Sequence, residues 1–125
     1  NANRNAMTTD SAARVLEEIM IHIVYQKNNL NLRNFLKRNL NKGFLENDSL
    51  NQIDGFLGAG LPESINLWSK AGLMSKVRHD SAWWINSQSL QTLLVVFCDG
   101  EDYSKDTSLL PAIAKEVFEY NEKFL

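Results

Sequence analysis

The sequence predicts a mostly helical α+β domain, with extra helices at both ends and one two-stranded β ribbon. Apolar residues recur at helical spacing in residues 12–27 and 31–41, and again near the end of the chain. Two short β-prone runs, residues 73–78 and 82–86, lie on either side of a polar turn. These three patterns together define the fold class that we expect.

Length and composition point to a single soluble domain. The chain has 125 residues, of which 44% are hydrophobic, and this is enough for a core without disulfides or a metal. Residues 1–10 look like a disordered arm or an expression remnant, so the domain is expected over residues 11–125. The only cysteine, Cys98, lies in an apolar run and favours a buried thiol and a cytoplasmic location. No apolar run reaches the roughly 20 residues that a membrane helix needs.

Two helices are expected first. Residues 12–27 carry an apolar stripe with Asp10 or Ser11 available as the N-cap, and His22 is expected at the boundary of the core. Residues 31–41 form an amphipathic helix whose outer side is cationic.

A helix-turn-helix pattern follows. Residues 48–57 carry a short helical stripe, which stops at Gly58 and Gly60. A second helix is expected to restart at Pro62, since proline suits the first helical position, and to end at Gly72.

The β ribbon is expected next, with residues 73–78 and 82–86 joined by a turn at residues 79–81. After the ribbon, Ser87 or Ser89 can cap a helix over residues 90–97. The same run is equally β-prone, so both alternatives stay open.

The last expected helix covers residues 108–124 and carries an apolar seam. The seam consists of Leu110, Ile113, Val117, Tyr120 and Phe124, at spacings of 3, 4, 3 and 4. It could pack on the core of its own domain, or it could form a homodimer.

From Ser49 to Leu94 the order of these elements resembles a winged helix-turn-helix domain, and it is faintly similar to the N-terminal modules of Mrr-type restriction proteins. The segment GLPESINLWSKAGLMSKVRHDSAWWIN carries the resemblance. The resemblance implies duplex DNA as a partner, contacted by the second helix and the wing. The implied DNA-binding residues are Ser64, Asn66, Ser69, Lys70, Lys76, Arg78 and His79, with Arg33, Lys37, Arg38 and Lys42 as candidates for phosphate contacts.

Other site types find little support in the sequence. Two histidines and one cysteine without metal-ligand spacing make a zinc site improbable. The acidic stretch of residues 99–106 lacks the ligand order of an EF-hand. We found no catalytic arrangement and expect no cofactor.

The leading hypothesis is therefore a non-enzymatic DNA-binding module, either a transcription regulator or the recognition part of a larger system. It agrees with the five cations and no acids in residues 19–45. The alternative is a protein–protein interaction module, such as a subunit or an immunity-type partner. The isoelectric point of about 5.7 favours this alternative.

Overall fold

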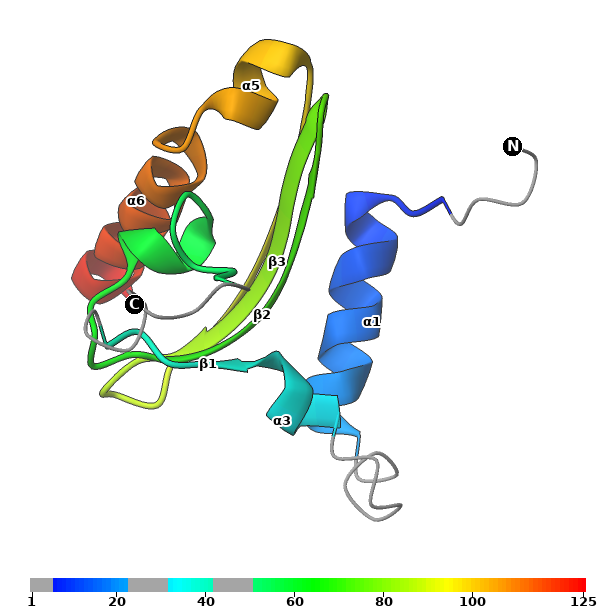
Figure 1. Ribbon diagram of the computed structural model, residues 1–125. Helices are drawn as coiled ribbons and strands as arrows, with labels where there is room; N and C mark the ends of the chain where they lie inside the picture. Colours follow the sequence, from blue (N-terminus) through cyan, green and yellow to red (C-terminus); the bar gives the residue numbers. More distant parts are fainter. Residues whose placement is uncertain (1–5, 23–31, 42–50) are drawn as a thin grey trace.

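The described part of the chain folds as a four-stranded antiparallel sheet with helices on both faces (Figure 1). The structure is a computed structural model that describes residues 6–22, 32–41 and 51–125. The strand order is β1-β2-β3-β4, so each strand lies beside the next one in the sequence. Helix α1 covers one face, and η1, α5 and α6 lie on the other side of the sheet.

The strands are β1 (Lys37–Arg38), β2 (Asn66–Met74), β3 (Val77–Ile85) and β4 (Gln91–Asp99). The helices are α1 (Thr9–Ile21), α3 (Leu32–Leu36), the 3-10 helix η1 (Leu57–Gly60), α5 (Glu101–Lys105) and α6 (Leu109–Phe124). Thr8 caps α1, since its side-chain oxygen accepts a hydrogen bond of 3.1 Å from the Ser11 amide.

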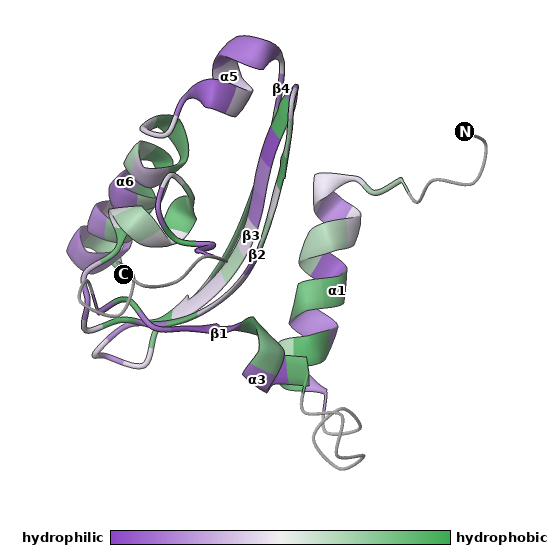
Figure 2. Cartoon of the chain, viewed as in Figure 1, coloured by the Kyte–Doolittle hydropathy of each residue, from purple (hydrophilic) through white to green (hydrophobic). Residues whose placement is uncertain are grey.

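Each face of the sheet carries its own core, because successive side chains of a strand point to opposite faces. On the α6 face, Leu67, Ala82 and Trp84 pack with residues of η1 and α6. On the α1 face, Trp83 packs with Leu16 and Met20. Figure 2 shows hydrophobic residues along both α1 and α6, as this two-sided packing requires.

The predicted helix-turn-helix is wrong, because most of its expected second helix, from Pro62 to Gly72, belongs to strand β2. Residues Ile65, Leu67, Ser69 and Ala71 are buried in alternation, which is the period of a strand. The expected two-stranded wing is also wrong. Residues 79–81 lie in the middle of β3, and the hairpin turns at residues 75–76 instead.

One further helix prediction is wrong, and one open alternative is resolved. Residues 31–41 were expected as one helix, but α3 ends at Leu36 and β1 follows at once. Residues 91–99 form β4, which is the β alternative left open above. The expected helical residues 23–27 and 48–50, and the expected phosphate-facing Lys42, lie outside the described residues. Within the described ranges, no helix combines the length and the apolar character that crossing a membrane requires.

Candidate functional site

The candidate site is the segment Lys70-Ala71-Gly72 in the middle of β2. Lys70 pairs with Ser81, and Gly72 pairs with His79, across the β2–β3 ladder. The alternation of the strand directs Lys70, Gly72 and their two partners toward the α1 face. The side chain of Ala71 lies instead in the core of the α6 face.

A groove of about 350 Å³ lies between α1 and this part of the sheet. Its apolar lining comes mainly from α1, with Leu36 of α3 and Phe97 of β4. Lys70 is the ionisable residue among its described lining, and Ser81 contributes a hydroxyl. An apolar groove with one cation and one hydroxyl can hold a small ligand that carries a negative group on an apolar body.

Gly72 leaves open space on the groove side of β2. A β-carbon built at this position would have no heavy atom closer than the His79 Cβ, at 3.9 Å. Packing within the described chain therefore does not explain the glycine. A glycine in a strand interior is suited to close approach of a ligand to the backbone.

His79 is held by its neighbours beside Gly72. The Cys98 amide donates a hydrogen bond of 3.1 Å to Nδ1 of His79, and the imidazole stacks on Phe97 with ring centroids 4.3 Å apart. Since Nδ1 is used as an acceptor, the neutral ring carries its proton on Nε2. This nitrogen remains as a donor.

Asp80 lies behind the candidate segment, on the α6 face, directly opposite Ala71. Its side chain is fully buried, and Oδ2 accepts a hydrogen bond of 3.0 Å from the Leu57 amide. Burial raises the pKa of Asp80 to about 7, against the opposing effects of the Leu57 and Ser81 amides and of the Arg38 and Lys70 charges. Asp80 thus ties the start of η1 to the strand next to Lys70.

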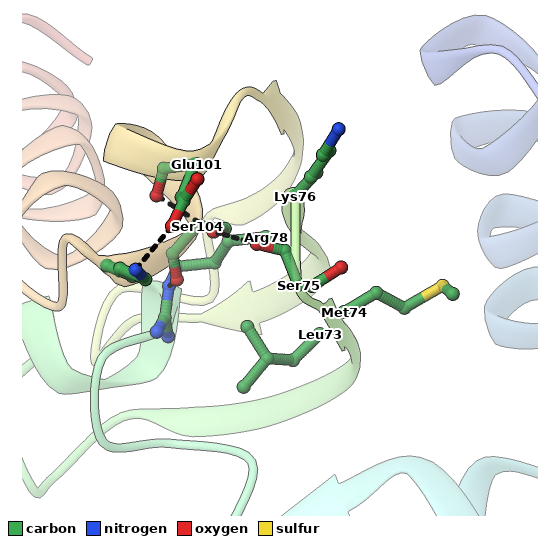
Figure 3. A pocket seen from close by; sticks show the side chains of 8 residues that line it. Leu73, Met74, Ser75, Lys76, Arg78, Glu101 and Ser104 are labelled. Carbon is green, nitrogen blue, oxygen red and sulfur yellow. Dashed lines mark hydrogen bonds and ion pairs between the residues drawn. The ribbon is translucent and has the colours of Figure 1, made fainter.

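The expected DNA-binding residues do not form one surface. Ser69 is fully buried. Arg78 is also buried, where Nε donates to the Ser104 carbonyl at 2.9 Å and Nη1 donates to the Gly55 carbonyl at 3.1 Å. In Figure 3 the side chains of Lys76 and Arg78 point in different directions from the β2–β3 hairpin. Ser64 precedes β2, and Asn66 is the first residue of that strand.

Three of the four expected phosphate-binding cations contact protein groups. Lys37 Nζ lies 4.0 Å and Arg33 Cζ 5.5 Å from the ring centroid of Trp68. Partial burial and then the neighbouring Arg33 lower the pKa of Lys37. Arg38 donates to the Ser69 carbonyl from Nη2 at 2.7 Å.

The expected dimer seam on α6 is shared between the core and the surface. Leu110 is fully buried, and Val117 packs on the core of the α6 face. Tyr120 and Phe124 are exposed. A contact between copies through this helix stays a prediction.

From the sequence alone, Lys70 is expected on a helix, and Gly72 and Ser81 are not expected at a binding site. The signal that could have identified them is the period-two alternation of apolar or small residues from Ile65 to Leu73. Among the described residues, no group of histidine, cysteine and acidic side chains is arranged to hold a metal ion.

Comparisons with known proteins bear on the fold. Neither a protein-family model nor a curated protein sequence matches the chain. Among solved structures, a β-lactamase from Streptosporangium roseum superposes with a TM-score of 0.70 at 18% identity, covering 97% of this chain and 43% of that chain. An ancestral class A β-lactamase of Gram-negative bacteria gives 0.68 at 18% identity, covering 94% and 42%. A mutant of that ancestor gives 0.71 at 17% identity, covering 98% and 44%.

These likenesses correct the interpretation of the sequence. The resemblance to winged-helix and Mrr-type modules is wrong, and with it the expectation of a non-enzymatic regulator that binds duplex DNA. The alternative of an interaction module gains no specific support. The chain spans less than half the length of these structures, and over that part it has the fold of class A β-lactamases.

Proposed function

We propose that this chain is the sheet-forming part of a β-lactamase-like serine hydrolase, and that Lys70 binds an anionic group of the substrate. The position of Lys70 and Gly72 on β2, open to the groove, is the observation that carries the proposal. Class A β-lactamases use three motifs, S-x-x-K, S-D-N and K-T-G. The segment Lys70-Ala71-Gly72 has the lysine and the glycine of the third motif.

The sequence departs from these motifs in two ways, and both limit the chemistry that Lys70-Ala71-Gly72 can perform alone. Ala71 stands where the third motif has threonine, so the hydroxyl is missing. The patterns S-x-x-K and S-D-N do not occur in the 125 residues. The nucleophilic serine of the proposed hydrolase therefore has to come from polypeptide outside this sequence.

The role proposed for Lys70 follows from its charge and its surroundings. An ammonium group and a carboxylate form a charge-assisted hydrogen bond, which is shorter and stronger than a neutral one. Ser81, directly opposite on β3, can add a hydroxyl donor. Lys70 Nζ now donates to the carbonyl oxygen of Ala71, and a bound anion would compete for this proton donor.

Binding of a β-lactam carboxylate tests the proposal on the chain itself. We expect benzylpenicillin to shift the amide NMR signals of residues 70–73 at millimolar concentration. Lys70→Ala should weaken this binding roughly tenfold or more, since it removes a hydrogen bond to a charged group. No acyl-enzyme adduct should form, because the S-x-x-K pattern is missing.

Lys76→Ala is the matched control, because Lys76 is exposed in the β2–β3 turn of the same hairpin. Its binding should equal that of the unchanged chain. Signals that shift only far from β2, or equal binding by the Lys70→Ala variant, would contradict the proposal.

The cytoplasmic location expected from the single cysteine also stays a prediction.

A further inference from the structure

Beyond the end of β1, side chains form hydrogen bonds with the backbone groups on the outer edge of β2. Within the described part of the chain, β1 pairs with Leu67 and Trp68. One step farther along β2, the Ser69 carbonyl accepts a hydrogen bond of 2.7 Å from Nη2 of Arg38. The Ala71 amide donates a hydrogen bond of 3.0 Å to Oε1 of Gln52. A strand that continued β1 would supply the same kind of bonds.

Arg38 and Gln52 are also joined to each other. Nη2 of Arg38 donates to Oε1 of Gln52 at 3.2 Å, so this oxygen accepts from both the guanidinium and the Ala71 amide. Nη1 of Arg38 donates to the Phe35 carbonyl at 3.2 Å, which fixes the guanidinium to the end of α3. The pair thus forms a connected network across the edge of β2.

We propose that Arg38 and Gln52 are positioning residues that clamp the backbone on both sides of Lys70. The clamp holds the Ser69 carbonyl and the Ala71 amide, the outward-pointing groups of the two residues that flank Lys70. It fixes the direction in which Lys70 projects into the groove. The inference rests on the proposed function only in treating Lys70 as a ligand-binding residue.

The acceptor at position 52 distinguishes a clamp from simple packing. Gln52→Glu keeps an acceptor oxygen at the same place, and a carboxylate suits both the guanidinium and an amide donor. Gln52→Leu keeps much of the volume and loses the acceptor. The clamp requires the acceptor oxygen, so Gln52→Glu should preserve the clamp and Gln52→Leu should abolish it. A packing role would make leucine the milder change.

Amide hydrogen exchange of the chain, read by NMR, provides the test. We expect Gln52→Leu to speed exchange of the Ala71 amide at least tenfold and to weaken benzylpenicillin binding, whereas Gln52→Glu retains both. Arg38→Lys should also speed exchange at Ala71, because lysine keeps the charge but lacks the planar fork. Gln88→Leu, at an exposed glutamine in the β3–β4 turn, is the control and should leave exchange at Ala71 unchanged.

The exchange measurement separates this inference from the proposed function. Rapid exchange in Gln52→Leu without any benzylpenicillin binding by the unchanged chain would support the clamp and remove the proposed ligand. Unchanged protection of Ala71 in both Gln52→Leu and Arg38→Lys would overturn the clamp. Equal loss of protection in Gln52→Glu and Gln52→Leu would also overturn it. If Gln52→Leu does not fold, Arg38→Lys and Gln52→Glu still decide between these outcomes.

Discussion

We expect the titration of Asp80 to lower the free energy of unfolding by roughly 4 kcal/mol as pH rises from about 4 to about 7. In the Asp80→Asn variant this decrease should be absent. The cause is the fully buried position of the carboxyl group on the α6 face, where burial raises its pKa to about 7 from an ordinary value of 3.8. Each pKa unit corresponds to about 1.4 kcal/mol.

The direction of the effect follows from where the proton resides. Between these two pKa values the folded chain keeps the proton on Asp80, and the unfolded chain releases it. The folded state therefore binds more protons, and stability falls with increasing pH in this window. The contribution is fully present below the unfolded pKa and is lost once pH passes the folded pKa.

Asparagine at this position stays neutral at every pH and keeps an oxygen for the Leu57 amide. Urea unfolding of both proteins between pH 4.5 and 8 measures the difference. Asp99→Asn is the control, because Asp99 is exposed at the end of β4. Parallel pH profiles for the unchanged chain and Asp80→Asn would show that the folded state does not retain this proton.

The sequence locates some elements correctly because their apolar periods are unambiguous. The seam from Leu110 to Phe124 has helical spacing, and α6 lies there. β2 was assigned as a helix because Pro62 and Gly72 are ordinary helix boundaries, and Leu67-Trp68 fits either period. β2 is a strand because it packs against other elements on both faces of the sheet. Those contacts cannot be deduced from the sequence of this segment alone.

β3 shows why the middle of the sheet could not be predicted. Arg78 and Asp80 occupy core positions on the α6 face, where the pattern leads one to expect apolar side chains. Arg78 donates to the Gly55 and Ser104 carbonyls, and Asp80 accepts from the Leu57 amide, so their partners are distant in the sequence. Because buried polar residues break the alternation, the sequence suggested a turn where the strand continues.

The candidate site was missed for the same reason. On a helix, Lys70 and Gly72 point in different directions, whereas on a strand they share one face. The groove beside them forms only when α1 packs on the sheet across a large sequence separation. The winged-helix resemblance selected Lys70 as a binding cation on a helix, whereas the structure places it on β2 beside the groove.

The contact of η1 with α6 is expected to fail when a single methyl group is added at Gly60. A β-carbon there would lie 2.0 Å from the Pro111 carbonyl oxygen and 3.0 Å from the Lys115 amide nitrogen. Both atoms belong to the backbone of α6, so no side chain can rotate away. The 3-10 helix would have to lift from α6, which would disturb the core that contains Leu57 and Leu110.

We expect Gly60→Ala to lower the free energy of unfolding by about 3 kcal/mol, the upper end of the usual cost of overpacking, because the clash is with backbone atoms that cannot rotate away. Thermal unfolding should show a decrease in Tm of roughly 10 °C. Gly72→Ala is the matched control, because its nearest neighbour would be the His79 Cβ at 3.9 Å, and its effect should stay within about 1 kcal/mol. Equal stability losses in the two variants would mean that η1 does not approach α6 this closely, and that glycine at position 60 is not required by the packing.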